Sequence, residues 1–221
     1  MHAAYDGCIA YLDHVVGGLL ERLQREPWYE GSLVIVTADH GELFGEKSLI
    51  DHGNSVDHGL TSIPMIVKFP GQTTPREVQS SVSQVDVFST IAAAAGVALP
   101  GPRPGVDLAA GDLDGGRTIV IESYPSINFI RDNPKMDRME RALVKGRWKM
   151  IESSRGRREL YDMVGDPDES VDLSSSRAEA QELDGLLREW VASAESQRPE
   201  ATFPPNERDL IPNLQALGYV K

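Results

Sequence analysis

Two ligand-type side chains follow directly after an apolar run in this chain. Residues 32–37 (Ser-Leu-Val-Ile-Val-Thr) have the composition of a strand covered on both faces, and Asp39-His40-Gly41-Glu42 comes shortly after them. Side chains just past the carboxyl end of a strand lie where open α/β sheets bind ligands. A carboxylate beside an imidazole, with a glycine that lets the backbone turn tightly, predicts half of a divalent-metal site. On these residues alone, a solvated strand end remains the alternative.

The segment that follows this turn is dense in ionisable side chains. Long loops over a rigid sheet are where function concentrates, so this segment is a candidate site loop. Its ionisable residues are Glu42, Glu46, Lys47, Asp51, His52, Asp57 and His58.

The surrounding elements follow an α/β order. Apolar residues recur at three- and four-residue spacing over residues 9–23, which predicts an amphipathic helix before the first strand. Residues 63–69 predict a second strand. Residues 82–95 predict a helix that stops at Gly96. Helix, strand, loop, strand and helix in this order favour an α/β domain.

Hairpin patterns dominate after residue 140. Residues 141–145 and 148–151 flank a predicted two-residue turn at Gly146-Arg147, and residues 158–162 predict a third strand. Residues 179–192 predict an amphipathic helix that covers this small antiparallel sheet. A basic cluster is expected to form a solvated hairpin tip: Arg155, Arg157 and Arg158.

Several short sequence motifs resemble those of the sulfatase family, which belongs to the alkaline-phosphatase-like superfamily. The specific ones are Tyr11-Leu12-Asp13-His14-Val15-Val16-Gly17 and Val34-Ile35-Val36-Thr37-Ala38-Asp39-His40-Gly41-Glu42. Other motifs are individually less specific, but they occur in the same order as in the family. They are Asp51-His52-Gly53, Ile63-Pro64-Met65-Ile66-Val67, Arg147-Trp148-Lys149-Met150-Ile151, Glu159-Leu160-Tyr161-Asp162, Asp166-Pro167-Asp168-Glu169 and Leu217-Gly218-Tyr219. The resemblance covers nearly the whole chain.

The resemblance implies an α/β fold, in which an alkaline-phosphatase-like sheet flanked by helices is present only in its C-terminal portion. A small C-terminal antiparallel α+β subdomain follows it. We therefore expect residues 1–125 to be the C-terminal portion of a sulfatase catalytic domain. Residues 126–221 would form the subdomain, with its helix and an extended tail from Ser196.

The resemblance also implies roles for single residues. Asp39 and His40 match two metal ligands, and His52 matches a basic position that contacts the sulfate oxygens and the leaving-group oxygen. Calcium is the first choice of ion, with manganese, magnesium or zinc as alternatives. His58 is expected to have a packing role. Gln84-Val85-Asp86 matches a family signature, although a favourable place in the first turn of a helix would explain Asp86.

The sequence contains no nucleophile of the family's type. Sulfatases attack with a formylglycine made from the first residue of a Cys/Ser-x-Pro-x-Arg motif, and this motif is absent here. Cys8 lacks the following proline and is expected to be a small buried residue. The function implied is metal-dependent sulfuric ester hydrolysis, incomplete in the isolated chain, with an N-terminal partner segment completing the site.

Two other functions stay open at this point. The first is a phosphonate or phosphate ester hydrolase of the same superfamily, because the nucleophile region that would decide is missing. The second is a non-catalytic remnant, or a subunit of a split enzyme.

Composition restricts the partners. The 221 residues carry 22 Lys and Arg against 34 Asp and Glu, a net charge of −12. A surface this acidic argues against nucleic acid and anionic membranes as partners, and no apolar run approaches the ~20 residues that span a bilayer. The expected partner is a sulfate-ester small molecule or a sulfated sugar. The sequence does not decide between cytoplasm and periplasm.

Overall fold

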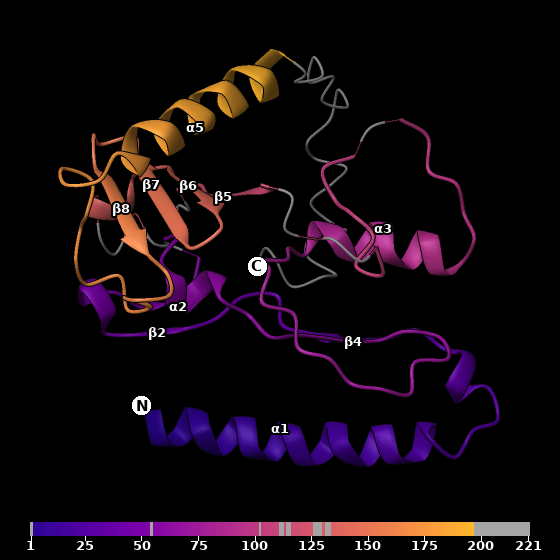
Figure 1. Ribbon diagram of the computed structural model, residues 1–221. Coiled ribbons are helices and arrows are strands. Elements are labelled where there is room, and N and C mark those ends of the chain that lie inside the picture. The colour runs from indigo at the N-terminus through magenta and orange to yellow at the C-terminus, as the bar shows by residue number, and fades with distance from the viewer. Residues whose placement is uncertain are drawn as a thin grey trace, which may run out of the picture. The chain divides into compact units, whose positions relative to one another are not determined.

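The computed structural model describes residues 2–53, 55–101, 103–110, 113, 116–125, 130 and 134–196. Its helices are α1 (His2–Leu23), α2 (His58–Thr61), α3 (Val85–Ala94) and α5 (Glu179–Ser196), and its 3₁₀ turns are η1 (Tyr29–Gly31), η2 (Glu46–Ser48) and η3 (Pro134–Met136). Its strands are β1 (Val34–Thr37), β2 (Leu43–Phe44), β3 (Ile50–Asp51), β4 (Met65–Lys68), β5 (Thr118–Ser123), β6 (Glu140–Lys145), β7 (Trp148–Ser153) and β8 (Arg158–Asp162) (Figure 1).

The chain divides into two units, Met1–Asp184 and Gly185–Lys221. The described part of the second unit is the last two thirds of α5, residues 185–196. The predicted tail after Ser196, including the C-terminal motif Leu217-Gly218-Tyr219, lies outside the described residues. The boundary expected between residues 125 and 126 stays a prediction.

The strand before the Asp-His turn pairs with the second predicted strand. β1 and β4 are antiparallel, with Val36 opposite Ile66. Among the described residues β4 is the one partner of β1. The expectation that β1 is covered on both faces is wrong for this structure, because its residues are half-buried or exposed and Ile66 is 65% exposed.

Helix α1 forms as predicted and begins earlier, at His2. None of its residues is buried, and the apolar stripe that includes Leu12 and Leu19 faces outward. Cys8 is therefore exposed, not buried as expected. The rings of His2 and Tyr5 contact the ring of Phe44, with centroids 4.5 and 4.8 Å apart.

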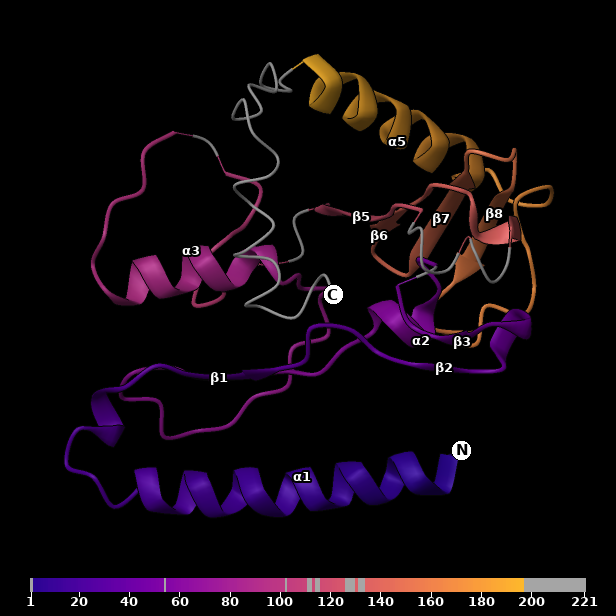
Figure 2. The same cartoon turned by 180° about the vertical axis from the view of Figure 1, so that it is seen from behind.

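The C-terminal sheet has one strand more than predicted. Its order is β5-β6-β7-β8, all antiparallel, so β5 extends the predicted three-stranded hairpin array (Figure 2). Lys145 pairs with Trp148 across the predicted two-residue turn, and Gly146 adopts φ 57, which favours glycine. The first turns of α5 contact this sheet through Lys145–Glu182 and Arg158–Asp184 ion pairs.

The best-buried apolar cluster lies at the C-terminal sheet. Ala142, Ile151 and Tyr161 of this sheet pack around Val56, which comes from the candidate site loop. This packing predicts that the loop's conformation depends on the sheet. The combination of helices, a strand pair and a small antiparallel sheet agrees with the predicted α/β class and its α+β subdomain.

Helix α3 is anchored by a buried carboxylate. Asp86 is fully buried, accepts from the backbone N–H groups of Ser83 and Val106, and forms a two-pronged ion pair with Arg117. A favourable position at the helix N-terminus is therefore an incomplete explanation of Asp86, whose main partner lies 31 residues away in sequence.

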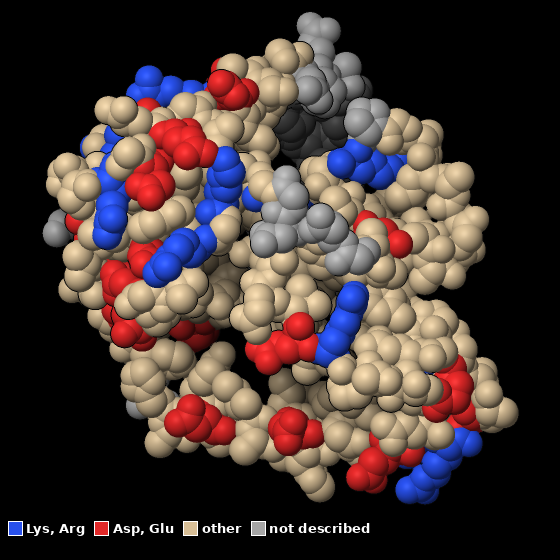
Figure 3. Space-filling model, viewed as in Figure 1, with Lys and Arg blue, Asp and Glu red and all other residues tan. Residues whose placement is uncertain are grey.

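Charged side chains of both signs are interspersed over β6–β8, whereas along α1 the basic atoms gather at its C-terminal end, where Arg22 lies (Figure 3). Within the described residues, every helix is too short or too polar to cross a bilayer.

Candidate active site

A cavity of about 620 Å³ collects the side chains singled out in the sequence. Asp39 and His40 reach it from the end of β1, His52 from the loop after β3, and His58 from the first residue of α2. The position of Asp39 and His40 just past the end of a strand predicted that they would lie at such a cavity. The folding of the loop brings the two later histidines to the same cavity.

Asp39 and His40 form a compact turn. The backbone N–H of His40 donates to the Asp39 carboxylate at 3.0 Å, and His40 Nε2 lies 3.6 Å from Asp39 Oδ2. His40 Nδ1 lies 2.9 Å from the Gly41 carbonyl oxygen, so the ring is oriented by its own backbone. The Asp39 side chain is 87% exposed, which leaves its oxygens accessible.

The rings of His40 and His52 stack, with centroids 4.2 Å apart and planes 21° from parallel. His52 Nδ1 lies 3.2 Å from Glu42 Oε2 and 2.8 Å from Asp51 Oδ1. Glu42, Asp51 and His52 each offer one ligand atom, and these atoms lie within 4.8 Å of one another. In the described part of the chain this is the one trio of His, Cys, Asp or Glu that meets this spacing, and it does not include Asp39 or His40.

Glu42 and Asp51 belong to this trio, although the sequence alone assigned them no role of their own. They were named only as part of a charged loop. Their positions in the sequence could have indicated this role, because Glu42 ends the Asp-His-Gly-Glu turn and Asp51 directly precedes His52.

Gly41 is required by a close approach rather than by the tight turn that the sequence suggested. Its N–H donates to the Leu60 carbonyl oxygen at 2.8 Å, and a Cβ on Gly41 would lie 2.0 Å from the carbonyl oxygen of Gly59. Only glycine lets α2 pack this close to the Asp-His turn.

Gln84 fixes the same turn from another element. Its Nε2 donates to the carbonyl oxygens of Ala38 and Asp39 at 2.8 and 3.0 Å. The residue lies just before α3, whose Asp86 is anchored by Arg117. The family signature at residues 84–86 therefore supports the Asp-His turn through side-chain contacts.

His58 is held by its backbone and faces the cavity with its ring. Its N–H donates to Glu169 Oε2 at 3.1 Å. Burial, assisted by the nearby Lys149 charge, lowers the pKa of His58 from its ordinary value of 6.5. The neutral ring can either donate or accept a hydrogen bond in the cavity.

Residues 1–97 match the family model described as Sulfatase. The chain therefore carries a sulfatase-family segment. Asp39, His40, His52, His58 and Gln84 all lie within this sulfatase segment.

About four fifths of the chain is similar to longer proteins. It is 30% identical over 172 residues to the uncharacterized sulfatase YidJ of Escherichia coli strain K12, covering 78% of this chain and 34% of that protein. A solved 2-O GAG sulfatase superposes with a TM-score of 0.71 at 22% identity, covering 83% of this chain and 41% of its own. A phosphonate monoester hydrolase from Silicibacter pomeroyi superposes with a TM-score of 0.65 at 20% identity, covering 85% and 39%.

These similarities confirm the resemblance to the sulfatase family. The chain spans about a third of the length of its curated relative YidJ. At their low identities, the two solved structures show that the fold is alkaline-phosphatase-like, as predicted.

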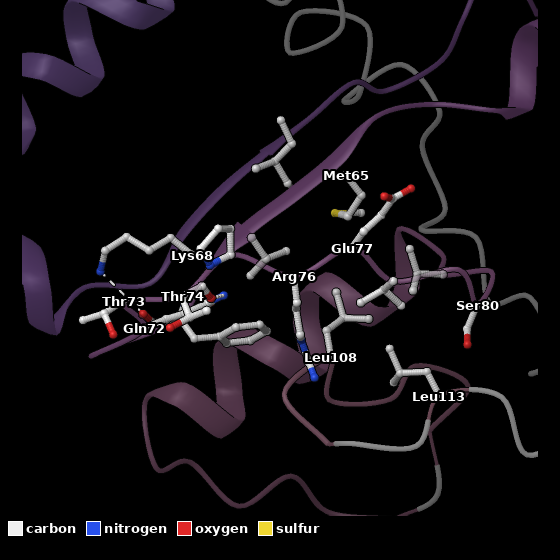
Figure 4. Close-up of a pocket in the computed structure, with 16 residues that line it drawn as sticks. Met65, Lys68, Gln72, Thr73, Thr74, Arg76, Glu77, Ser80, Leu108 and Leu113 are labelled. Carbon is white, nitrogen blue, oxygen red and sulfur yellow. Dashed lines mark hydrogen bonds between the residues drawn. The ribbon is translucent and has the colours of Figure 1, made fainter.

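A second cavity, of about 550 Å³, also borders the sulfatase segment. Met65 and Lys68 of β4 line one side, and Leu108 and Leu113 line the other (Figure 4). Its lining is mainly apolar and contains no histidine. Asp39 and the three histidines line the first cavity, so we assign the candidate active site there.

Proposed function

We propose that this chain contributes the later half of a sulfatase active site and acts in sulfuric ester hydrolysis. Asp39 and His40 are the proposed metal ligands, and His52 is the proposed catalytic residue. The observation that carries the proposal is the convergence of these three side chains on one cavity after β1, with the His40 and His52 rings in contact.

The donor set fits a divalent cation. Carboxylate oxygens with an imidazole nitrogen suit calcium, manganese, magnesium or zinc, and calcium remains our first choice. Glu42 and Asp51 add carboxylates beside His52, which lines the cavity, so oxygen donors additional to the two proposed ligands lie next to it. When bound, the cation would polarise the ester oxygens of the substrate.

His52 is oriented for contact with an anionic ester. Its Nδ1 faces the carboxylates of Glu42 and Asp51, which leaves Nε2 as the nitrogen to meet substrate. A protonated ring can donate Nε2–H to a sulfate oxygen or to the departing oxygen, which offsets the negative charge that develops there.

The proposed substrate is a small sulfate ester or a sulfated sugar. The similar GAG sulfatase structure supports the sugar class. The net charge of −12 means that local cations, not the overall field, must attract such an anion. An N-terminal partner segment is proposed to supply the nucleophile and the remaining ligands.

Metal binding tests the proposed ligands. We expect the purified chain to bind Mn²⁺ in a calorimetric titration, and Asp39→Asn and His40→Ala each to weaken binding about tenfold or more, since each removes one ligand. Asp13→Asn, on α1, is the matched control and should leave the affinity unchanged. Equal affinity in all four proteins would contradict the assignment.

Turnover tests the incompleteness of the chain. We expect no hydrolysis of a chromogenic aryl sulfate by the chain alone with calcium, manganese or zinc, because its sequence lacks the Cys/Ser-x-Pro-x-Arg motif. Co-expression with the N-terminal part of a sulfatase relative should give activity that disappears in His52→Ala. Turnover by the chain alone would refute this prediction.

Two alternatives are supported by specific observations. The phosphonate monoester hydrolase of similar fold supports a phosphonate or phosphate ester as substrate. The lack of a Cys/Ser-x-Pro-x-Arg motif in this sequence keeps a non-catalytic remnant or a split-enzyme subunit as the second alternative. Comparing phenyl phosphonate esters with aryl sulfates in the co-expressed complex separates the first alternative. Absence of any activity there favours the second.

A further inference from the structure

A buried lysine–glutamate pair connects the site loop, residues 38–62, to the C-terminal sheet. Lys149 lies on β7, and its Nζ is 2.6 Å from Oε1 of Glu169, in the segment after β8. The two side chains are 0% and 1% exposed. A buried pair is tolerated only when hydrogen bonds satisfy both charges, so the other partners of this pair matter.

Both members of the pair also bind the backbone of the site loop. Lys149 Nζ donates to the Val56 carbonyl oxygen at 2.6 Å, and Glu169 Oε2 accepts from the His58 N–H at 3.1 Å. Figures 1 and 2 both show α2 beside the sheet that carries Lys149. The pair therefore fixes the loop on both sides of Asp57.

A second contact closes the loop around His52. Lys47 Nζ lies 3.3 Å from the same Glu169 Oε2 that binds His58, and 2.7 Å from Asp57 Oδ1. Both ends of the segment 47–58 thus meet at one carboxylate oxygen. His52 lies within this closed segment.

The backbone of this segment is strained. Lys47, Ser48 and Asp51 have φ values of 48, 62 and 72, and Glu169 itself has φ 50. Such conformations in residues other than glycine persist only where surrounding contacts hold them. The contacts that hold the first half of the segment include the Lys47–Glu169 ion pair.

We propose that Lys149 and Glu169, which we call the latch, are positioning residues for the candidate active site. They hold residues 47–58 on the C-terminal sheet, so that His52 stays stacked on His40 and beside Glu42. The inference deepens the proposed sulfatase function and rests on it. We assign the latch a role that acts through His52: Lys149 also lines the cavity, but its ammonium is held by the Val56 carbonyl oxygen and the Glu169 carboxylate.

A double replacement tests this role. Lys149→Met with Glu169→Leu removes both charges together, which avoids leaving one of them buried and unpaired. In the full chain, we expect amides of residues 55–61 to exchange with solvent about tenfold faster or more, because their anchoring hydrogen bonds are lost. Amides of β6 and β7 should keep their protection.

The ring signals of the histidines provide a readout that a merely structural pair would not change. In the wild-type chain the stacked rings should shift each other's proton resonances. In the double variant we expect the His40 and His52 ring protons to move toward random-coil values. Unchanged exchange of residues 55–61 and unchanged ring shifts in the folded variant would overturn the proposal.

Lys145→Met with Glu182→Leu is the matched control, since it removes an ion pair that joins the same sheet to α5 and not to the site loop. It should leave the loop amides and the histidine rings unchanged. If the latch double variant does not fold, Glu169→Gln provides the test. The single amide oxygen of glutamine can accept only some of the hydrogen bonds that the two carboxylate oxygens of Glu169 accept. It should give the same two effects, and their absence would overturn the proposal.

The proposed function and the latch fail separately. If the wild-type chain binds neither Mn²⁺ nor inorganic sulfate, the proposed sulfatase site is contradicted, while accelerated exchange in the latch variant would still show that the pair positions the loop. If the chain binds Mn²⁺ and the latch variant leaves residues 47–61 unchanged, the site stands and the latch is refuted.

Discussion

Replacing Asp86 with alanine should lower the free energy of unfolding by about 3–5 kcal/mol, the usual cost of removing one partner from a buried ion pair. The variant leaves Arg117, whose side chain is 17% exposed, without its carboxylate partner. It also leaves the N–H groups of Ser83 and Val106 without their acceptor. Urea unfolding of the wild-type and variant chains, followed by circular dichroism, measures the change.

Two further variants separate the ion pair from a general effect of lost carboxylates. Asp107→Ala removes a half-buried acid from the segment after α3, where it accepts only a local hydrogen bond from the Ala109 N–H, and should change stability by about 1 kcal/mol or less. Asp86→Leu with Arg117→Met removes both charges and should recover part of the loss. A change below 1 kcal/mol in Asp86→Ala would contradict the importance that we assign to the pair.

The same replacement should reach the candidate active site. Asp86 anchors the start of α3, and Gln84, two residues earlier, holds the Ala38 and Asp39 carbonyl oxygens. A looser α3 start therefore loosens the Asp-His turn. We attribute the family signature at residues 84–86 to this support.

The sequence allowed most local elements to be predicted, since periodicity and turn residues are local properties. The strand that ends before Asp39 and the hairpin around Gly146 were found with small errors in their ends. Asp39 and His40 line a cavity, and their place at a strand end is the local feature that suggested one; their role as metal ligands stays a prediction.

Contacts between residues that are far apart in the sequence could not be predicted. Glu169 binds the His58 N–H across 111 residues, and Gln84 reaches Ala38 across 46. No local pattern distinguishes such a glutamate or glutamine from a solvated one. Arg157 illustrates the error: it was expected at a solvated hairpin tip, yet it lies 3.5 Å from Asp57 and 3.2 Å from Glu140.

Burial of β1 was predicted wrongly for a related reason. An apolar composition indicates that a strand suits a covered sheet, but it does not say which segment covers it. In the described residues β4 is its one neighbouring strand, so Val34 and Ile35 remain half-buried.

Acid should weaken the contact between the site loop and the sheet through Asp57. Burial alone would raise its pKa, but hydrogen bonds from Lys47 and Ser55 and the Lys47 charge lower the pKa of Asp57 to about 2, from 3.8. The folded state therefore favours the ionised carboxylate. Its contribution to stability is complete above pH 4 and is lost as the pH falls toward 2, an effect of about 2 kcal/mol.

Comparison with Asp57→Asn isolates this contribution from other acids. The asparagine variant should be less stable at pH 7, and its free energy of unfolding should fall by about 2 kcal/mol less than that of the wild type between pH 5 and 2. Parallel curves for the two proteins would show that Asp57 is not held ionised by Lys47. Because Lys47 also binds Glu169, such a result would weaken the case for a loop fixed at both ends around His52.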